Sequence, residues 1–242
     1  MKSNIFNLLR TSVLLTSIGA MGATYAAVTL DRTRIIFDGD QQSINITIRN
    51  DNPELPYLAQ SWLEDASEKK LEAGPIIATP PIQRMEPKST SLVRLSTAPD
   101  ISKLPQDRES LFYYNLREIP PKSTEAGVLQ IALQSRVKLF YRPEAIVADS
   151  KKEWAKQVTL TPTANGYQLN NPTSFYLTVI GIGNSQKQSE QSDFDAVMVP
   201  PKSTHNLKSA KFATPYLTYI NDYGGKPSLA FKCQASQCTV TP

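Results

Sequence analysis

The sequence predicts an all-β protein built from two immunoglobulin-type β-sandwich domains. Apolar and polar residues alternate with a period of two over many short segments, as at 44–48 and 129–133. Clusters of Asp, Asn, Gly and Pro separate these segments, and no window combines a sustained helical period with capping residues. One such sandwich takes about 100 residues, so a chain of 242 residues has room for two.

The first 26 residues form a predicted secretory signal peptide. Lys2 and Arg10 lead into an apolar run at 13–20, and small residues follow as far as Ala26. A membrane anchor is the alternative, but Arg10 interrupts the run, which is shorter than the ~18 apolar residues that a spanning helix needs. We therefore expect cleavage between Ala26 and Ala27, export of the product, and no membrane insertion.

A polar stretch at 148–152 marks the predicted domain boundary. Residues 27–148 would form the N-terminal domain and residues 149–242 the C-terminal domain. Three copies of Pro-Lys-Ser-Thr occur along the chain, at 87–90, 121–124 and 201–204. Their spacings fit no single period, so we interpret them as recurring turn chemistry and not as an internal duplication.

Composition excludes several classes of function. The formal net charge is +4, and loss of Lys2 and Arg10 with the signal peptide lowers it by 2 to +2. This charge is too near neutral for the concentrated basic face that nucleic acid requires. One histidine, His205, and two cysteines leave too few ligands for most metal sites. Ser-x-x-Lys at 67–70 lacks its companion motifs, and no nucleophile elbow accompanies His205. The sequence therefore predicts no metal, no cofactor and no enzymatic activity.

The two cysteines are expected to form a structural disulfide. Cys233 and Cys238 are five positions apart near the C-terminus and lack the Cys-x-x-Cys spacing of a redox site. An exported protein reaches an oxidising compartment, where such a pair becomes oxidised. We expect this bridge to fasten a terminal hairpin.

Residues 128–141 form an unusually long predicted strand, about 14 residues where five or six is usual. Its first half carries Leu129, Ile131 and Leu133 on one face, and its second half carries cations on the opposite parity. An ordinary core strand explains this pattern. So does a template that lends apolar side chains and backbone hydrogen bonds to another chain. Periodicity alone leaves both interpretations open.

Three longer motifs decide between them. The chain reads Leu-Phe-Tyr-Tyr-Asn-Leu-Arg-Glu-Ile-Pro-Pro at 111–121, Lys-Leu-Phe-Tyr-Arg-Pro at 138–143 and Tyr-Ile-Asn-Asp-Tyr-Gly-Gly at 219–225. These motifs resemble those of the periplasmic chaperones of chaperone–usher pili, over essentially the whole chain after residue 26. The short loop at 122–127 is similar to that of the short-loop subfamily, which assembles rod-like pili. The resemblance implies two immunoglobulin-like domains set at an angle, with a cleft between them.

The resemblance also implies how such a protein captures its partner. Arg34 and Lys138 match the cleft pair that anchors the C-terminal carboxylate of a pilus subunit. A subunit of this system has an incomplete sandwich that lacks its last strand, and the chaperone inserts its own. Leu129, Ile131 and Leu133 match the alternating residues of that donated strand.

Further residues match two other features of the family. Glu109, Arg142 and Asp222 match an ion network that bridges the two domains. The family's usher-facing patch maps to Pro56, Leu58, Ile82 and Ile119. Packing in the core is the alternative explanation for these four apolar residues.

The expected protein is thus a periplasmic chaperone that stabilises and caps pilus subunits and delivers them to the usher. Its subunits would include pilins, tip adaptors and the adhesin, and self-association of the free protein stays open. One rival is an exported tandem-sandwich adhesin or structural surface protein. A second rival is an exported hydrolase that uses His205.

Overall fold

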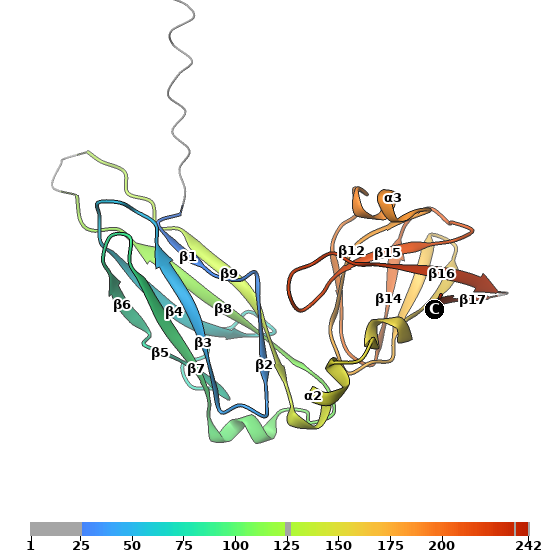
Figure 1. Cartoon of the computed structure of the whole chain (residues 1–242), viewed down its shortest axis with the longest axis horizontal. Helices are drawn as coiled ribbons and strands as arrows, with labels where there is room; N and C mark the ends of the chain where they lie inside the picture. Colours follow the sequence, from blue (N-terminus) through green and yellow to red (C-terminus); the bar gives the residue numbers. More distant parts are fainter. Residues whose placement is uncertain (1–25, 124–126, 235, 242) are drawn as a thin grey trace, which may run out of the picture.

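The computed structural model describes residues 26–123, 127–234 and 236–241 and consists of two β-sandwich lobes set at an angle (Figure 1). The predicted all-β, two-domain fold is confirmed. The signal peptide and part of the loop at 122–127 lie outside the described residues. No helix among the described residues is long and apolar enough to cross a membrane.

The N-terminal lobe consists of two sheets packed face to face. One has the order β1-β3-β7-β5 and the other the order β2-β9-β8-β4-β6. Alternation along each strand sends one set of side chains between the sheets, where Phe37, Ile46, Tyr114 and Leu139 are fully buried. The strands are β1 (Val28–Leu30), β2 (Arg34–Asp38), β3 (Ser43–Asn50), β4 (Tyr57–Asp65), β5 (Ile76–Thr79), β6 (Ile82–Met85), β7 (Thr90–Thr97), β8 (Ser110–Ile119) and β9 (Gln134–Arg142).

The C-terminal lobe has its own core, enclosed by eight strands in the order β13-β12-β15-β16-β17-β10-β11-β14. Tyr167, Leu177 and Phe231 lie at its centre. The short helix α3 (Gln186–Glu190) packs on β12 and β15. The strands are β10 (Thr159–Thr163), β11 (Gly166–Asn171), β12 (Leu177–Gly183), β13 (Val197–Val199), β14 (Ser203–Lys208), β15 (Tyr216–Ile220), β16 (Ser228–Gln234) and β17 (Gln237–Val240).

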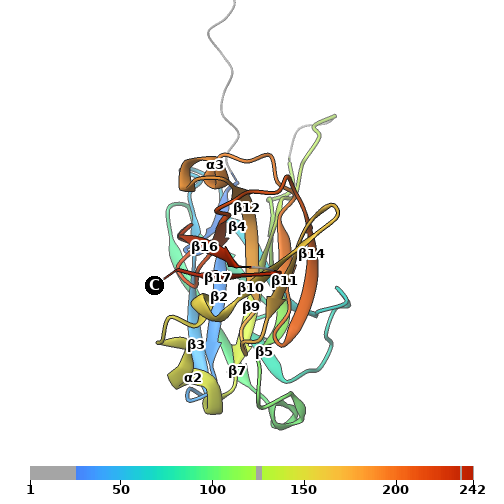
Figure 2. The same cartoon turned by 90° about the vertical axis from the view of Figure 1, so that its right-hand side faces the viewer.

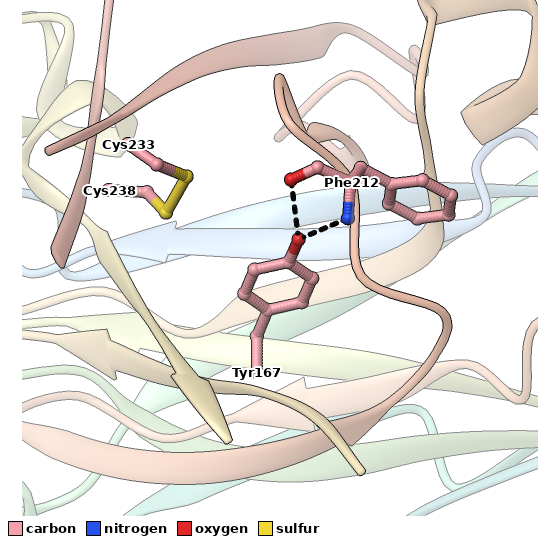
Figure 3. Close-up of a disulfide and its surroundings, with 4 residues drawn as sticks. All are labelled: Tyr167, Phe212, Cys233 and Cys238. Atoms are coloured by element: carbon pink, nitrogen blue, oxygen red, sulfur yellow. Dashed lines mark hydrogen bonds between the residues drawn. A yellow bond between two sulfur atoms is a disulfide. The ribbon is translucent and has the colours of Figure 1, made fainter. Parts of the chain in front are cut away.

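The predicted disulfide is confirmed, and it fastens the last hairpin of the chain. Cys233 of β16 lies directly opposite Cys238 of β17 in the antiparallel register, and the two are bonded (Figure 3). Nearby, the hydroxyl of the buried Tyr167 donates to the carbonyl of Phe212 and accepts from its amide N–H. The hydroxyl thus holds the segment before β15 against the core.

Two of the three Pro-Lys-Ser-Thr segments, those at 87–90 and 201–204, make the same corner in the two lobes. In the N-terminal lobe, the buried Asn50 donates from its side-chain amide to the carbonyls of Met85 and Glu86. The backbone N–H of Lys88 donates to the carbonyl of Asn52, and Lys88 has a positive φ of 56°.

The C-terminal lobe repeats each of these contacts. The buried Asn171 donates to the carbonyls of Val199 and Pro200, and the N–H of Lys202 donates to the carbonyl of Thr173. Lys202 has a positive φ of 52°. A search for one fixed period misses this equivalence because the copy at 121–124 lies between these two in the chain and breaks the spacing.

The helix α2 (Glu144–Ser150) follows β9 directly and leads from one lobe to the other (Figures 1 and 2). It contains the predicted boundary between residues 148 and 149, and that division stays a prediction. The two hydrophobic cores are separate, so contacts between the lobes come from the strand ends and loops around this crossing.

Candidate functional site

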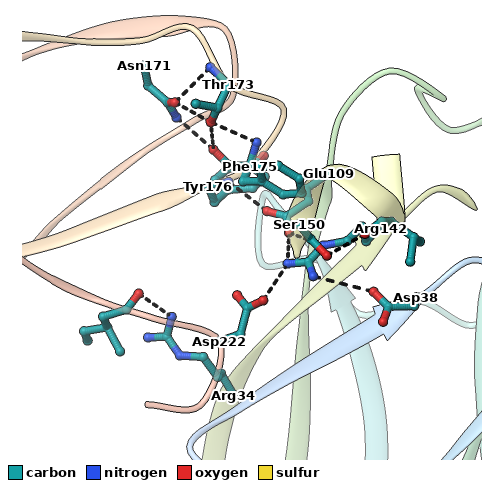
Figure 4. A network of polar contacts seen from close by, with 12 residues as sticks. Arg34, Asp38, Glu109, Arg142, Ser150, Asn171, Thr173, Phe175, Tyr176 and Asp222 are labelled. Carbon is teal, nitrogen blue, oxygen red and sulfur yellow. Dashed lines mark hydrogen bonds and ion pairs between the residues drawn. The ribbon is translucent and has the colours of Figure 1, made fainter. Parts of the chain in front are cut away.

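A buried cluster of charged side chains joins the two lobes. Arg142, at the end of β9, donates to Glu109 Oε1 from Nε at 3.1 Å and from Nη2 at 2.8 Å (Figure 4). Its Nη2 also lies 3.0 Å from Asp222 Oδ2, in the loop between β15 and β16 of the other lobe. Asp38 Oδ1 of β2 lies 3.6 Å from Nη1. One guanidinium therefore links three carboxylates drawn from both lobes.

Burial and charge compete within this cluster. Burial raises the pKa of Glu109 to about 7, although the charge of Arg142 and a hydrogen bond from the backbone N–H of Tyr176 oppose the change. Burial alone would lower the pKa of Arg142, but Glu109 and Asp222 outweigh it and raise that pKa. Such a network sets orientation more reliably than it adds net stability.

Contacts that the sequence analysis missed reinforce this junction. The N–H of Glu109 donates to the carbonyl of Ser174, and the hydroxyl of Ser174 donates to the carbonyl of Asp107. Asp107 also pairs with Lys202 of the C-terminal lobe. These contacts join loop residues far apart in the chain, and no local pattern marks loop residues of this kind.

Arg34 and Lys138 lie side by side, because β2 pairs with β9 in a parallel register that places them opposite each other. Arg34 Nη1 donates to the carbonyl of Ile220 at 3.3 Å, while its buried Nε has no hydrogen-bond partner among the described residues. Burial lowers the pKa of Arg34, and burial followed by the charge of Arg34 lowers the pKa of Lys138. Two adjacent half-buried cations form a site suited to an anion such as a carboxylate.

The edge of β9 is open on one side next to this pair. Within the part of the chain that the structure describes, β2 pairs with β9 only from Lys138 to Arg142. The start of the strand, from Gln134 to Val137, pairs with β8 on its other side alone. Unpaired backbone groups at such an edge are a template for a strand from another chain.

The predicted strand at 128–141 is shorter in the structure, where β9 begins only at Gln134. Pairing of β8 with β9 ends at Gln134, and the segment after β8 begins with Pro120 and Pro121. Proline has no backbone N–H, so these residues cannot continue the ladder of hydrogen bonds. The extension of the strand to 128–133 was therefore wrong for the free chain.

The apolar side chains of this segment are exposed to solvent. Leu129 is 84%, Ile131 65% and Leu133 43% exposed. They share the parity of Val137 and Leu139, which face the core of the N-terminal lobe. The segment therefore continues the apolar face of β9 beyond the sandwich.

The residues expected to face the usher gather at the far end of the N-terminal lobe. Leu58 of β4 lies opposite Ile119 of β8, and both line a surface hollow of about 270 Å³ with Pro56. Ile82 pairs with Gln60, two residues further along β4, on the same face as Leu58. Ile82 and Leu58 are exposed, so they lie outside the core.

Comparison with known proteins identifies the family. The model of the PapD N-terminal domain, described as a pili and flagellar-assembly chaperone, matches residues 27–147. The model of the C-terminal domain of the pili assembly chaperone PapD matches residues 153–231. The chain belongs to the PapD family of pilus-assembly chaperones.

Individual relatives agree with this family. The chain is 58% identical over 215 residues to the chaperone protein PapD of Escherichia coli. The aligned residues cover 89% of this chain and 90% of that protein. It is 41% identical to the chaperone protein PmfD of Proteus mirabilis, with 99% and 97% covered. The crystal structure of the periplasmic chaperone SfaE superposes with a TM-score of 0.68 at 30% identity, over 84% of this chain and 98% of that one.

Membership of this family supports a chaperone role over an adhesin or a structural surface protein. In an adhesin, the open edge of β9 and the exposed apolar residues beside it would be an aggregation hazard. In a chaperone, the same open edge and apolar side chains can pair with a strand of another chain.

Proposed function

We propose that this chain is a periplasmic, non-enzymatic chaperone that captures pilus subunits by donating the segment around Leu129, Ile131 and Leu133. A signal peptide cleaved between Ala26 and Ala27 would direct it to the periplasm. The observation that carries the proposal is that an exposed apolar segment lies directly before the open edge of β9. This edge ends at the two cations Arg34 and Lys138. We propose domain limits of 27–148 and 149–242.

The open edge gives the incoming strand a defined end. A subunit strand that pairs along β9 from Gln134 can continue only as far as Lys138, because β2 occupies the edge beyond that residue. Its terminal carboxylate would therefore lie at Arg34 and Lys138. Charge-assisted hydrogen bonds to two fixed cations would then set the register of the subunit.

The donated side chains would supply the apolar contact. Burial of a leucine or isoleucine side chain contributes about 1.5–3 kcal/mol. Leu129, Ile131 and Leu133 start from exposed positions, so they gain this contribution only when they enter the groove of an incomplete subunit. Release of the subunit to the usher would then draw on folding free energy that the chaperone–subunit complex retains. We propose that neither a cofactor nor a metal takes part.

The same proposal assigns the patch of Pro56, Leu58, Ile82 and Ile119, of which Leu58 and Ile82 are exposed, to the outer-membrane usher. This patch lies at the opposite end of the N-terminal lobe from the interdomain cluster. The donor segment reaches the same end of the lobe, because Gln130 donates to the carbonyl of Pro121 beside this hollow, so the usher would contact the chaperone next to the bound subunit.

Ile131→Asp tests the donor segment. We expect the free variant to keep its melting temperature and to lose subunit capture, because an unpaired charge would enter an apolar groove. Ala132→Asp is the matched control, since it places the same charge one residue further on, on the opposite face. Capture is measured by copurification with a co-expressed pilus subunit. If Ile131→Asp unfolds the free protein, the segment belongs to the core and the proposal fails.

A further inference from the structure

Tyr223 is an aromatic residue with no structural role inside this chain. It lies at the tip of the loop between β15 and β16, and it is 96% exposed. Its side chain makes no hydrogen bond or ring contact with any residue that the structure describes. An isolated tyrosine this exposed contributes nothing to the fold.

The loop that carries Tyr223 is nevertheless tightly constrained. Asn221 Oδ1 accepts hydrogen bonds from the N–H of Tyr223 at 3.1 Å and from the N–H of Gly225 at 2.8 Å. The backbone of Asn221 exchanges further hydrogen bonds with Gly224 and Gly225, each at 3.0 Å. The loop thus closes on one asparagine and holds its backbone in a single shape.

Both neighbours of Tyr223 also lie close to the N-terminal lobe. Asp222 pairs with Arg142 at 3.0 Å (Figure 4). Gly224 has a φ of +80°, and a Cβ there would lie 2.9 Å from Thr33 Oγ1, so the loop passes too close to Thr33, just before β2, to carry a side chain at this position. Tyr223 is therefore presented rigidly at the junction between the lobes.

Tyr223 lines the same hollow as Arg34, one member of the cation pair. Tyr223, Arg34, Ile36 and Arg142 line one hollow of about 650 Å³ between the lobes. Arg34 reaches the base of the same loop through its hydrogen bond to the carbonyl of Ile220. Tyrosine is enriched among the residues that dominate binding energy, and its ring supplies a large contact area at a low cost in conformational entropy.

We propose that Tyr223 packs against an apolar or aromatic side chain that lies directly before the terminal carboxylate of a bound subunit. The inference rests on the proposed function, since it takes Arg34 and Lys138 as the carboxylate site. Tyr223 would then read the side chain next to the carboxylate, while the two cations read only the charge. The loop of the C-terminal lobe would add selectivity to a strand held by the N-terminal lobe.

Peptide binding to the full chaperone tests this assignment. The probe is a synthetic peptide with the C-terminal sequence of a pilus subunit that copurifies with the chaperone, and affinity is measured by calorimetry. We expect Tyr223→Ala to weaken binding about tenfold or more, and Tyr223→Phe to bind nearly as wild type. Leu92→Ala is the control, because it removes an exposed apolar side chain from the outer face of the other sheet.

A double-mutant cycle identifies the partner of Tyr223. When the peptide residues nearest the carboxylate are changed to alanine, Tyr223→Ala should cost no further affinity. Equal affinities of wild type and Tyr223→Ala for the unchanged peptide would overturn the inference. A C-terminal amide peptide that binds as well as the free acid would instead overturn the carboxylate site, so the two failures are distinguishable.

Discussion

Arg142 and Glu109 form a buried ion pair through two hydrogen bonds from one guanidinium to one carboxylate oxygen, at 3.1 and 2.8 Å. Glu109 precedes β8 and Arg142 ends β9, so both belong to the N-terminal lobe. The link to the other lobe depends on the same guanidinium, which also contacts Asp222. The pair therefore fixes the side chain on which the interdomain contact is built.

Removal of Glu109 should be costly. Glu109→Ala leaves a buried cation with fewer partners, and we expect a loss of about 3 kcal/mol in the free energy of unfolding, because Asp222 and Asp38 still compensate in part. Asp107→Ala, at an exposed ion pair, should cost much less, because solvent screens exposed charges. Urea unfolding measures both. Equal losses would contradict a special role for the buried pair.

The raised pKa of Glu109 predicts a pH dependence of stability. A carboxyl with a higher pKa in the folded than in the unfolded state binds its proton more tightly when folded. Its contribution to stability is fully present below its ordinary pKa of 4.5 and is lost as the pH rises through about 7. Wild type should therefore lose stability relative to Glu109→Gln across this window in urea unfolding. A gain relative to Glu109→Gln would mean that Arg142 outweighs burial.

The cation pair should be required for subunit capture but not for folding. Lys138→Ala or Arg34→Ala removes one charge-assisted partner of a carboxylate, which costs about 2–5 kcal/mol and reduces affinity at least tenfold. Arg49→Ala, at an exposed cation of β3 in the other sheet, is the control. Melting temperature and subunit copurification are measured together. Unchanged capture by a folded Lys138 variant would remove the anchoring role.

The usher-facing patch should separate delivery from capture. Leu58→Ser combined with Ile82→Ser changes only exposed side chains of the proposed patch. We expect normal copurification with subunits and a loss of surface pili, counted by electron microscopy in cells that carry the usher. Loss of subunit copurification would show instead that the patch belongs to the capture surface.

The disulfide should contribute to stability alone. Replacement of both Cys233 and Cys238 by serine should lower the free energy of unfolding by about 2 kcal/mol, because the bridge closes only a short loop in the unfolded chain. The bridge lies in the last hairpin, in the lobe that does not carry the donor segment (Figure 3). Subunit capture at moderate temperature should persist. A folded double variant that fails to capture would place this hairpin in the binding surface.

Local sequence patterns determined much of this structure. Two-residue alternation predicted the all-β fold because the pleat of a strand alternates its side chains between two faces. The spacing of Cys233 and Cys238 predicted a terminal hairpin with a disulfide, which β16 and β17 form. Each of these inferences uses residues within a few positions of one another.

Only the tertiary structure decided where strands end and which residues meet. Alternation continues through Leu129, Ile131 and Leu133, yet β9 begins at Gln134, because a strand also needs a neighbour and Pro120 and Pro121 donate no hydrogen bonds. The contacts of Ser174 with Asp107 and of Arg142 with Asp222 join positions far apart in the chain. Periodicity records which way a side chain points, but it does not record which distant residue it meets.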